Sequence, residues 1–271
     1  MAARKGARAS GARKDLLLAV DAGNSNVVVG VFHGARLKGH YRLSSLTQRT
    51  GDEVFLLLED LVRRSGAATG SGRMAVCSVV PTLTPLLAEA GERLFRRPAL
   101  VVDHEMKLGL KYRVHDPSTL GADRIVNAVA AFELYGGPAV VVDLGTATSF
   151  DAVTAKGELL GGAIAPGIMI SAEELFRRAA RLGRVELRRP PRAIGRNTEE
   201  NIQAGVVFGA VGQVDGVVTR ILKELKGGRA KVIATGGLAE VVARDSATIQ
   251  IVDPELTLKG LRFIDARMRG K

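Results

Sequence analysis

The segments DAGNSN (residues 21–26) and DLGTAT (residues 143–148) decide the fold of this chain. Each follows a short apolar run, LLLAV or AVVV, and leads into a second one, so each is expected to turn one β-strand into the next. A third predicted strand follows in both places, RLKGHYRL and then ELLGGAIA. One Asp-x-Gly turn could be a coincidence of common turn residues. Two copies in matching positions indicate an internal duplication, with the site expected between the copies.

The remaining pattern extends each copy into an α/β lobe. After its three strands, the first lobe has four apolar residues at helical spacing, Val54, Leu57, Leu58 and Leu61. Strand, helix and strand follow, which gives βββαβαβ. The second lobe starts with a helix, repeats the three strands, and continues with helices and strands in alternation. We predict a disordered basic tail over residues 1–14, an N-terminal lobe over 15–118 and a C-terminal lobe over 119–271.

The composition narrows the class of protein. The chain has 271 residues, of which 46% are hydrophobic and 25% charged, as in ordinary globular proteins. We find no uninterrupted apolar run of the roughly 18 to 20 residues that span a membrane, and expect no membrane association. The net charge of +11 suits nucleic acid, but only 4% of residues are aromatic and we find no basic–aromatic interleaving of the kind that stacks bases, so we expect no nucleic-acid partner. The single cysteine, Cys77, excludes an internal disulfide and predicts a buried thiol in a reducing cytoplasm.

The two Asp-x-Gly turns offer a way to bind phosphate groups. Neither a P-loop nor a G-x-G-x-x-G motif follows any predicted strand. Glycine lets the backbone approach a phosphate closely. The side-chain donors expected beside the exposed N–H groups are Asn24, Ser25, Thr146 and Thr148. Because an aspartate heads each turn, a cation is needed as well, and we expect Asp21 and Asp143 to hold Mg²⁺ or a monovalent ion. The alternative is that either aspartate caps its own turn.

The sequence Gly121-Ala122-Asp123-Arg124 opens the first helix of the second lobe. A helix N-terminus attracts anions through its free N–H groups and partial positive charge. Arg124 can clamp a carboxylate or phosphate with two hydrogen bonds. Asp123 is expected to be ionised near neutrality and to accept a hydroxyl proton. The alternative is an ordinary first-turn aspartate beside a surface arginine.

Glycines mark three further places. Residues 161–167 and 234–238 are each expected to follow a strand and precede a helix, and the second segment suits an adenine or ribose face or a plain turn. A predicted helix over residues 201–225 carries four glycines on one face. Each costs roughly 1 kcal/mol relative to alanine, so another backbone, from the same chain or a second subunit, is expected to approach closely. These glycines are Gly205, Gly209, Gly212 and Gly216.

A set of segments resembles the type III pantothenate kinase family. They are DAGNSN, GADRIVNAVAA, DLGTATSFD, GGAIAPGI, GRNT, ATGGLA and DPELTLKGL, in this order. The resemblance spans about residues 16–267. It implies duplicated ribonuclease-H-like lobes of the actin-like ATPase kind. It also implies transfer of the ATP γ-phosphate to pantothenate, giving 4′-phosphopantothenate in the first step of coenzyme A biosynthesis, by a cytoplasmic homodimer that needs Mg²⁺ and a monovalent cation, K⁺ or NH₄⁺.

The resemblance also assigns roles to single residues. It implies that Asp123 is the proton acceptor and that Asp143 binds the monovalent cation. For Asp21, the cation expected from the turn itself is Mg²⁺, assisted through phosphate or water. The implied ATP contacts are Asp21, Ala22, Gly23, Asn24, Ser25, Asn26, Val27, Val28 and Thr146. The implied pantothenate contacts are Gly121, Ala122, Asp123, Arg124 and Thr198.

Two positions depart from the family pattern. Ser25 replaces a common threonine and keeps the hydroxyl, whereas Val114 stands where many members have a substrate-contacting tyrosine. Val114 puts the shape of the pantothenate pocket in question. Two other functions remain open from the sequence: a non-catalytic, ATP-binding regulatory relative, and a kinase or phosphohydrolase of the same fold with another substrate.

Overall fold

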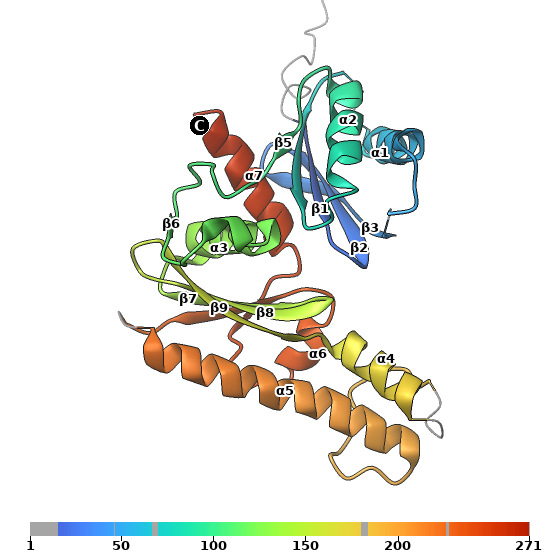
Figure 1. The fold of residues 1–271 in the computed structure, drawn as a ribbon, viewed down its shortest axis with the longest axis vertical. Helices are drawn as coiled ribbons and strands as arrows, with labels where there is room; N and C mark the ends of the chain where they lie inside the picture. Colours follow the sequence, from blue (N-terminus) through green and yellow to red (C-terminus); the bar gives the residue numbers. More distant parts are fainter. Residues whose placement is uncertain (1–15, 46, 67–69, 180–183, 226–227, 271) are drawn as a thin grey trace, which may run out of the picture. The chain divides into compact units, whose positions relative to one another are not determined.

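A computed structural model describes residues 16–45, 47–66, 70–179, 184–225 and 228–270 (Figure 1). The predicted tail over residues 1–14 lies outside them. The chain forms two compact units. The first extends to Asp103 and includes the C-terminal end from Asp265, and the second is His104–Ile264. We describe each unit by itself.

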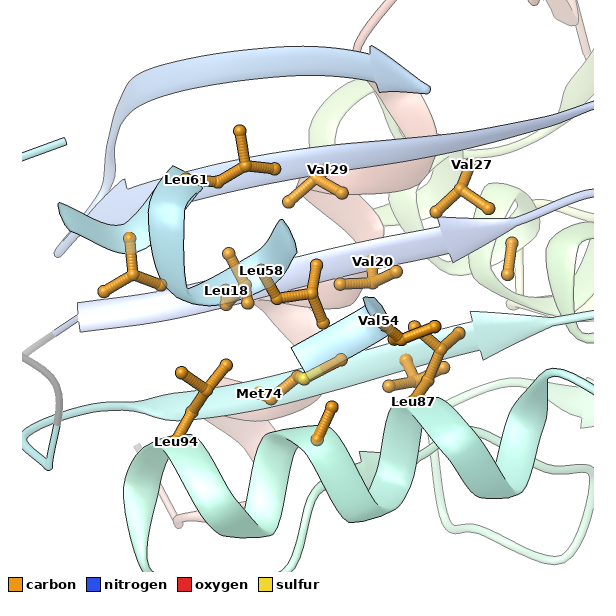
Figure 2. Packing of buried hydrophobic residues seen from close by; sticks show 14 of the residues in the cluster. Leu18, Val20, Val27, Val29, Val54, Leu58, Leu61, Met74, Leu87 and Leu94 are labelled. Atoms are coloured by element: carbon orange, nitrogen blue, oxygen red, sulfur yellow. The ribbon is translucent and has the colours of Figure 1, made fainter. Parts of the chain in front are cut away.

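The first unit contains a mixed five-stranded sheet with two helices. Its elements are β1 (Leu16–Ala22), β2 (Asn26–His33), β3 (Arg36–Ser44), α1 (Gly51–Arg64), β4 (Arg73–Ser78), α2 (Thr84–Phe95) and β5 (Leu100–Val101). The strand order is β3-β2-β1-β4-β5. Figure 2 shows the core, in which Val54 and Leu58 of α1 and Leu87 of α2 lie over Leu18 and Val20 of β1. Both helices therefore cover the same face of the sheet.

The second unit contains a six-stranded sheet and most of the helices. Its elements are β6 (Lys111–Tyr112), a 3₁₀ turn (Pro117–Thr119), α3 (Ala122–Tyr135), β7 (Ala139–Leu144), β8 (Ala147–Val153), β9 (Glu158–Pro166), α4 (Ile168–Arg178), α5 (Thr198–Glu224), β10 (Lys231–Thr235), α6 (Ala239–Ala243), β11 (Ile251–Val252) and α7 (Leu256–Met268). The strand order is β11-β10-β7-β8-β9-β6. Helix α7 begins in this unit and ends in the first.

The two sheets repeat one topology. In each, the first strand pairs antiparallel with the second and parallel with the strand that follows the third. Strands β3-β2-β1-β4-β5 therefore match β9-β8-β7-β10-β11. This arrangement confirms the predicted duplication and the βββ opening of each copy. Residues 161–165 were predicted both in the strand ELLGGAIA and in a turn between strand and helix; the strand is confirmed, because β9 continues to Pro166, and the turn is shorter than predicted, because α4 begins at Ile168.

The sheet of the second unit is covered on both faces. Val140 and Val142 of β7 pack with Val214 of α5 on one face. Ala139 and Val141 of the same strand pack with α3 on the other. Because side chains alternate along a strand, Asp143 shares the α3 face with Val141. Asp151 on β8 pairs directly with Val141 and therefore lies on that face too.

Helix α5 has the length and composition of a membrane span, unlike any other described helix. The sequence predicts no segment that could span a membrane when only uninterrupted apolar residues are counted. The most apolar stretch of α5 instead includes glycines and amide side chains but few charges, and this corrects that expectation. Only 22% of that stretch is buried in this chain. One helix of this kind is weak support for a membrane protein, because core helices of soluble proteins can meet the same criteria.

Candidate active site

Asp123 lies in the first turn of α3, where the helix dipole favours a negative charge. Its Oδ1 accepts the backbone N–H of Arg124 at 2.8 Å. Burial raises the pKa of Asp123, and the N–H and charge of Arg124 act in the opposite direction. The carboxylate therefore keeps one oxygen fixed by the backbone in a poorly solvated position, which makes it a stronger proton acceptor than an exposed aspartate.

Arg124 forms an ion pair with the sheet below the helix. Its Nε and Nη2 donate to Oδ1 of Asp151 at 2.9 and 2.7 Å. The Asp151 side chain is 1% exposed and that of Arg124 15%. Burial raises the pKa of Asp151 to about 6, against the opposing effect of Arg124. The predicted two-pronged clamp is therefore directed at Asp151, and a substrate anion can use only the remaining donors.

Asp143, at the end of β7, is held by α3. Its Oδ2 accepts a hydrogen bond from Nδ2 of Asn127 at 3.0 Å, and Thr257 of α7 donates to Oδ1 of Asn127 at 2.8 Å. Asn127 is 2% exposed. One oxygen of Asp143 is therefore fixed from α3, while its expected role as a cation ligand stays a prediction.

The electrostatics around Asp143 fit a bound cation. Burial, helped by the negative charges of Asp123 and Asp151, raises the pKa of Asp143 to about 7, and the Asn127 hydrogen bond opposes the rise. A cation would offset this accumulated negative charge. Within the described residues, no group of three or more acidic, histidine or cysteine side chains could hold a metal ion alone. The donor set therefore fits an ion bound by one carboxylate, with its other ligands supplied by water or substrate.

Gly236 leaves room for the side chain of Asp143. The turn after β10 leads into α6, as predicted, and Gly236 there has a φ of +92°. A Cβ on Gly236 would lie 2.6 Å from Oδ1 of Asp143. The missing side chain lets this turn contact the carboxylate directly.

Comparison with known proteins identifies the family. The model of the type III pantothenate kinase family matches residues 17–220. The chain belongs to the type III pantothenate kinase family. Curated type III pantothenate kinases from Moorella thermoacetica and Myxococcus xanthus are 51% and 49% identical to it, each over 93% of this chain and over 99% and 98% of their own lengths.

Solved structures agree on the fold alone. The ROK hexokinase of Thermus thermophilus is 14% identical, with a TM-score of 0.51 over 92% of this chain and 98% of its own. MreB 5 of Spiroplasma citri, bound to AMPPNP, is 9% identical, with a TM-score of 0.57 over 94% and 97%. These likenesses support the duplicated actin-like fold.

The remaining residues expected from the pantothenate kinase resemblance lie in the two Asp-x-Gly turns and at the start of α5. Residues 21–28 form the β1–β2 hairpin of the first unit, where Gly23 N–H donates to the carbonyl of Asn26 at 2.9 Å and Asn24 is exposed. Thr146 lies partly exposed in the matching turn of the second unit. Thr198 is exposed at the start of α5. That helix covers the sheet face opposite α3, so within the second unit Thr198 is not brought to Arg124.

One predicted donor was wrong. Thr148 is 1% exposed, on the sheet face that carries Phe150 and α5, and its Oγ1 has no hydrogen-bond partner among the described residues. The prediction treated Thr148 as part of the turn, whereas β8 has already begun at Ala147 and directs alternate side chains into the core. It cannot donate to a phosphate from there.

The sequence prediction also missed three site residues. Asn127 lies four positions after Asp123, on the same helix face, and a polar residue in that apolar pattern was an available signal. Asp151 follows Asp143 on the next strand at a spacing that puts both on one face of the hairpin. Thr257 lies in the segment DPELTLKGL of the family resemblance, but nothing local indicated its partner, because only the tertiary fold brings α7 to α3.

Proposed function

We propose that α3 presents Asp123 and Arg124 to pantothenate, so that Asp123 accepts the proton of the hydroxyl that becomes phosphorylated. The reaction of the family is the ATP-dependent phosphorylation of pantothenate to 4′-phosphopantothenate, the first step of coenzyme A biosynthesis. The observation that carries the proposal is the set of side chains on the α3 face, Asp123, Arg124, Asn127, Asp143 and Asp151.

The roles follow from charge and position. Arg124 supplies positive charge for the carboxylate of pantothenate, next to the N–H groups of Gly121 and Ala122 at the start of α3. Asp123 orients the hydroxyl for in-line attack and takes its proton. Phosphoryl transfer depends mostly on positioning and charge neutralisation. A raised pKa therefore suits Asp123, because a weakly solvated carboxylate holds the hydroxyl firmly.

ATP and Mg²⁺ are the cofactors expected of a kinase in this family. We propose that ATP contacts residues 21–28 and Thr146, through turn N–H groups other than those of Gly23 and Gly145, which close the turns. Asp21 would assist Mg²⁺ through phosphate or water. When bound, Mg²⁺ supplies neutralising charge to the phosphate oxygens.

We propose that Asp143 binds the monovalent cation, K⁺ or NH₄⁺. The support is electrostatic: two neighbouring carboxylates and burial act against its negative charge. Asn127 fixes one oxygen of Asp143, which leaves Oδ1, the atom nearest Gly236, for the ion.

We also propose a cytoplasmic homodimer built on α5. A Cβ on Gly205, Gly209 or Gly212 would meet no atom within 4 Å in the described structure, so packing inside the chain does not compensate for these glycines. Exposed apolar side chains lie on α4, which contacts α5, including Met169 at 43% exposure and Ile170 at 45%. A second copy would cover these surfaces and can supply Thr198, which α5 carries on the face away from α3.

A coupled assay of ADP release tests the proposed reaction. We expect ADP release to require pantothenate and to be faster in K⁺ than in Na⁺. A non-catalytic ATP-binding relative would release no ADP in response to pantothenate, and a kinase for another alcohol would respond to pantetheine or simple sugars instead.

Asp123→Asn tests the proton acceptor. The amide keeps the shape but cannot take the proton, so we expect kcat to fall by about 10²- to 10⁴-fold while ATP still binds. Exposed Asp116, six residues before α3, provides the matched control: Asp116→Asn should leave kcat near the wild-type value. Near-normal turnover in Asp123→Asn would remove Asp123 from the acceptor role.

A further inference from the structure

We propose that Asp151 is a positioning residue of this reaction, which holds the Arg124 guanidinium so that its free edge meets the carboxylate of the substrate. The inference rests on the proposed function and extends it to a residue that does not itself touch substrate. Asp151 lies on β8 and Arg124 on α3, so their ion pair fixes the N-terminus of the helix to the sheet.

The hydrogen-bond geometry leaves one edge of the guanidinium for a ligand. A guanidinium has five N–H donors in a fixed plane. Arg124 directs Nε and one N–H of Nη2 at a single oxygen of Asp151. This pairing does not use either N–H group of Nη1. The side chain keeps 15% exposure, so this edge remains reachable although its partner is buried.

The burial of the pair argues for a positioning role. A buried ion pair contributes little net stability, because the desolvation of both charges offsets their attraction. Arginine otherwise retains considerable rotamer freedom, and fixing it before the ligand arrives lowers the cost of binding. Asp151 therefore prepares the arginine in advance of the substrate.

A second ion pair in the same unit offers a matched control. Arg189 donates from Nε and Nη2 to Asp245 at 2.6 and 2.7 Å, using the same two donor atoms. The side chains of Arg189 and Asp245 are 38% and 20% exposed. Asp245→Asn makes the same chemical change as Asp151→Asn, but at a pair that touches no proposed site residue.

The experiment compares steady-state kinetics on two alcohols. One is pantothenate, and the other is pantothenol, which has an alcohol in place of the carboxylate. We expect Asp151→Asn to raise KM for pantothenate about tenfold to a hundredfold, the scale of a charge-assisted contact, with kcat changed much less. KM for pantothenol should stay near the wild-type value. Asp245→Asn should alter neither KM.

Two outcomes would overturn the proposal. One is an equal change in Asp151→Asn for both alcohols. The other is a further rise in KM for pantothenate when Asp151→Asn is added to Arg124→Gln, because a residue that acts through Arg124 has no effect once that guanidinium is gone. The double variant removes both charges of the buried Arg124–Asp151 pair, so it remains informative if Asp151→Asn alone fails to fold. Wild-type protein inactive on pantothenate would instead refute the proposed function.

Discussion

The two Asp-x-Gly turns share a fold but differ in their surroundings. In both, the aspartate is next to last on the first strand of its sheet, and the glycine N–H closes the turn, Gly23 to Asn26 and Gly145 to Ala147. The second turn is covered by α3, which brings Asn127 to Asp143. The described part of the first unit has no helix before its opening strand.

The strands that pair parallel with β1 and β7 also differ in the space that they leave beside the aspartate. In the first sheet, Ser78 pairs with Ala22, directly after the pairing of Cys77 with Asp21. In the second, Thr235 pairs with Asp143 and Gly236 follows. A serine is accommodated in one copy, whereas the other has space only for a hydrogen. The duplicated scaffold therefore has a crowded, acidic face around Asp143, which its own unit provides, whereas the described part of the first unit has no matching helix at the turn of Asp21.

The largest expected effect comes from filling the space beside Asp143. Gly236→Ala places a Cβ 2.6 Å from Oδ1 of Asp143 and 2.7 Å from the backbone of Leu144, at a φ that alanine rarely adopts. We expect a loss of roughly 3 kcal/mol or more in the free energy of unfolding, and loss of turnover. Denaturant unfolding and the ADP assay measure the two effects.

Gly228→Ala is the control for Gly236→Ala. Gly228 also has a positive φ, +114°, but a Cβ there would meet nothing within 4 Å. Backbone strain alone should cost about 1 to 3 kcal/mol and leave turnover unchanged. Equal losses of stability and activity in the two variants would show that the space beside Asp143 is unimportant.

A smaller effect is expected in the pH dependence of stability. Asp143 has a pKa of about 7 in the folded chain, above its ordinary value of 3.8. The folded protein therefore binds this proton more tightly than the unfolded chain does. The stabilisation is complete below about pH 4 and lost as the pH rises through 7. We expect Tm, measured without added K⁺, to fall across this range.

Asp143→Asn should make that decline shallower, because the amide has no proton to lose, and the contribution of Asp151, whose pKa is raised to about 6, remains. The corresponding variant of the first turn, Asp21→Asn, should keep the decline because Asp143 remains. An unchanged slope in Asp143→Asn would assign the pH dependence to other groups.

The smallest effect is expected at Thr257, which contacts Asp143 only through Asn127. Thr257→Val removes the hydroxyl that donates to Oδ1 of Asn127 at 2.8 Å. We expect a loss of about 1 kcal/mol in stability, and a higher K⁺ concentration for half-maximal turnover, because the amide that holds Asp143 is less well fixed. Thr119→Val, which removes an exposed hydroxyl bonded to the carbonyl of Asp116, should leave the K⁺ requirement unchanged. The same K⁺ requirement in both variants would contradict the role of Thr257.

Local sequence patterns were enough to predict the duplication. Alternating apolar residues and Asp-x-Gly turns act over a few positions, so the hairpins led by Asp21 and Asp143 could be predicted. The helix start at Gly121 was equally local. These features also placed Asp123 and Arg124 at a helix N-terminus, where the structure has them.

What could not be predicted depends on contacts between distant residues. The pairing of Arg124 with Asp151 joins a helix to a strand, and that of Thr257 with Asn127 joins α7 to α3. Such contacts are set by how the helices pack on the sheet. Thr148 shows the reverse error: strand alternation would have placed it in the core, but it was grouped with the turn.

The single cysteine, Cys77, allows the opening of the first sheet to be followed by thiol labelling. Cys77 lies on β4 directly opposite Asp21 of β1 and is completely buried. A thiol reagent can react with it only after the structure around these strands opens. The labelling rate therefore records the opening of the hairpin that carries Asp21 in the unaltered protein, while the described sheet around Asp143 contains no thiol and stays silent.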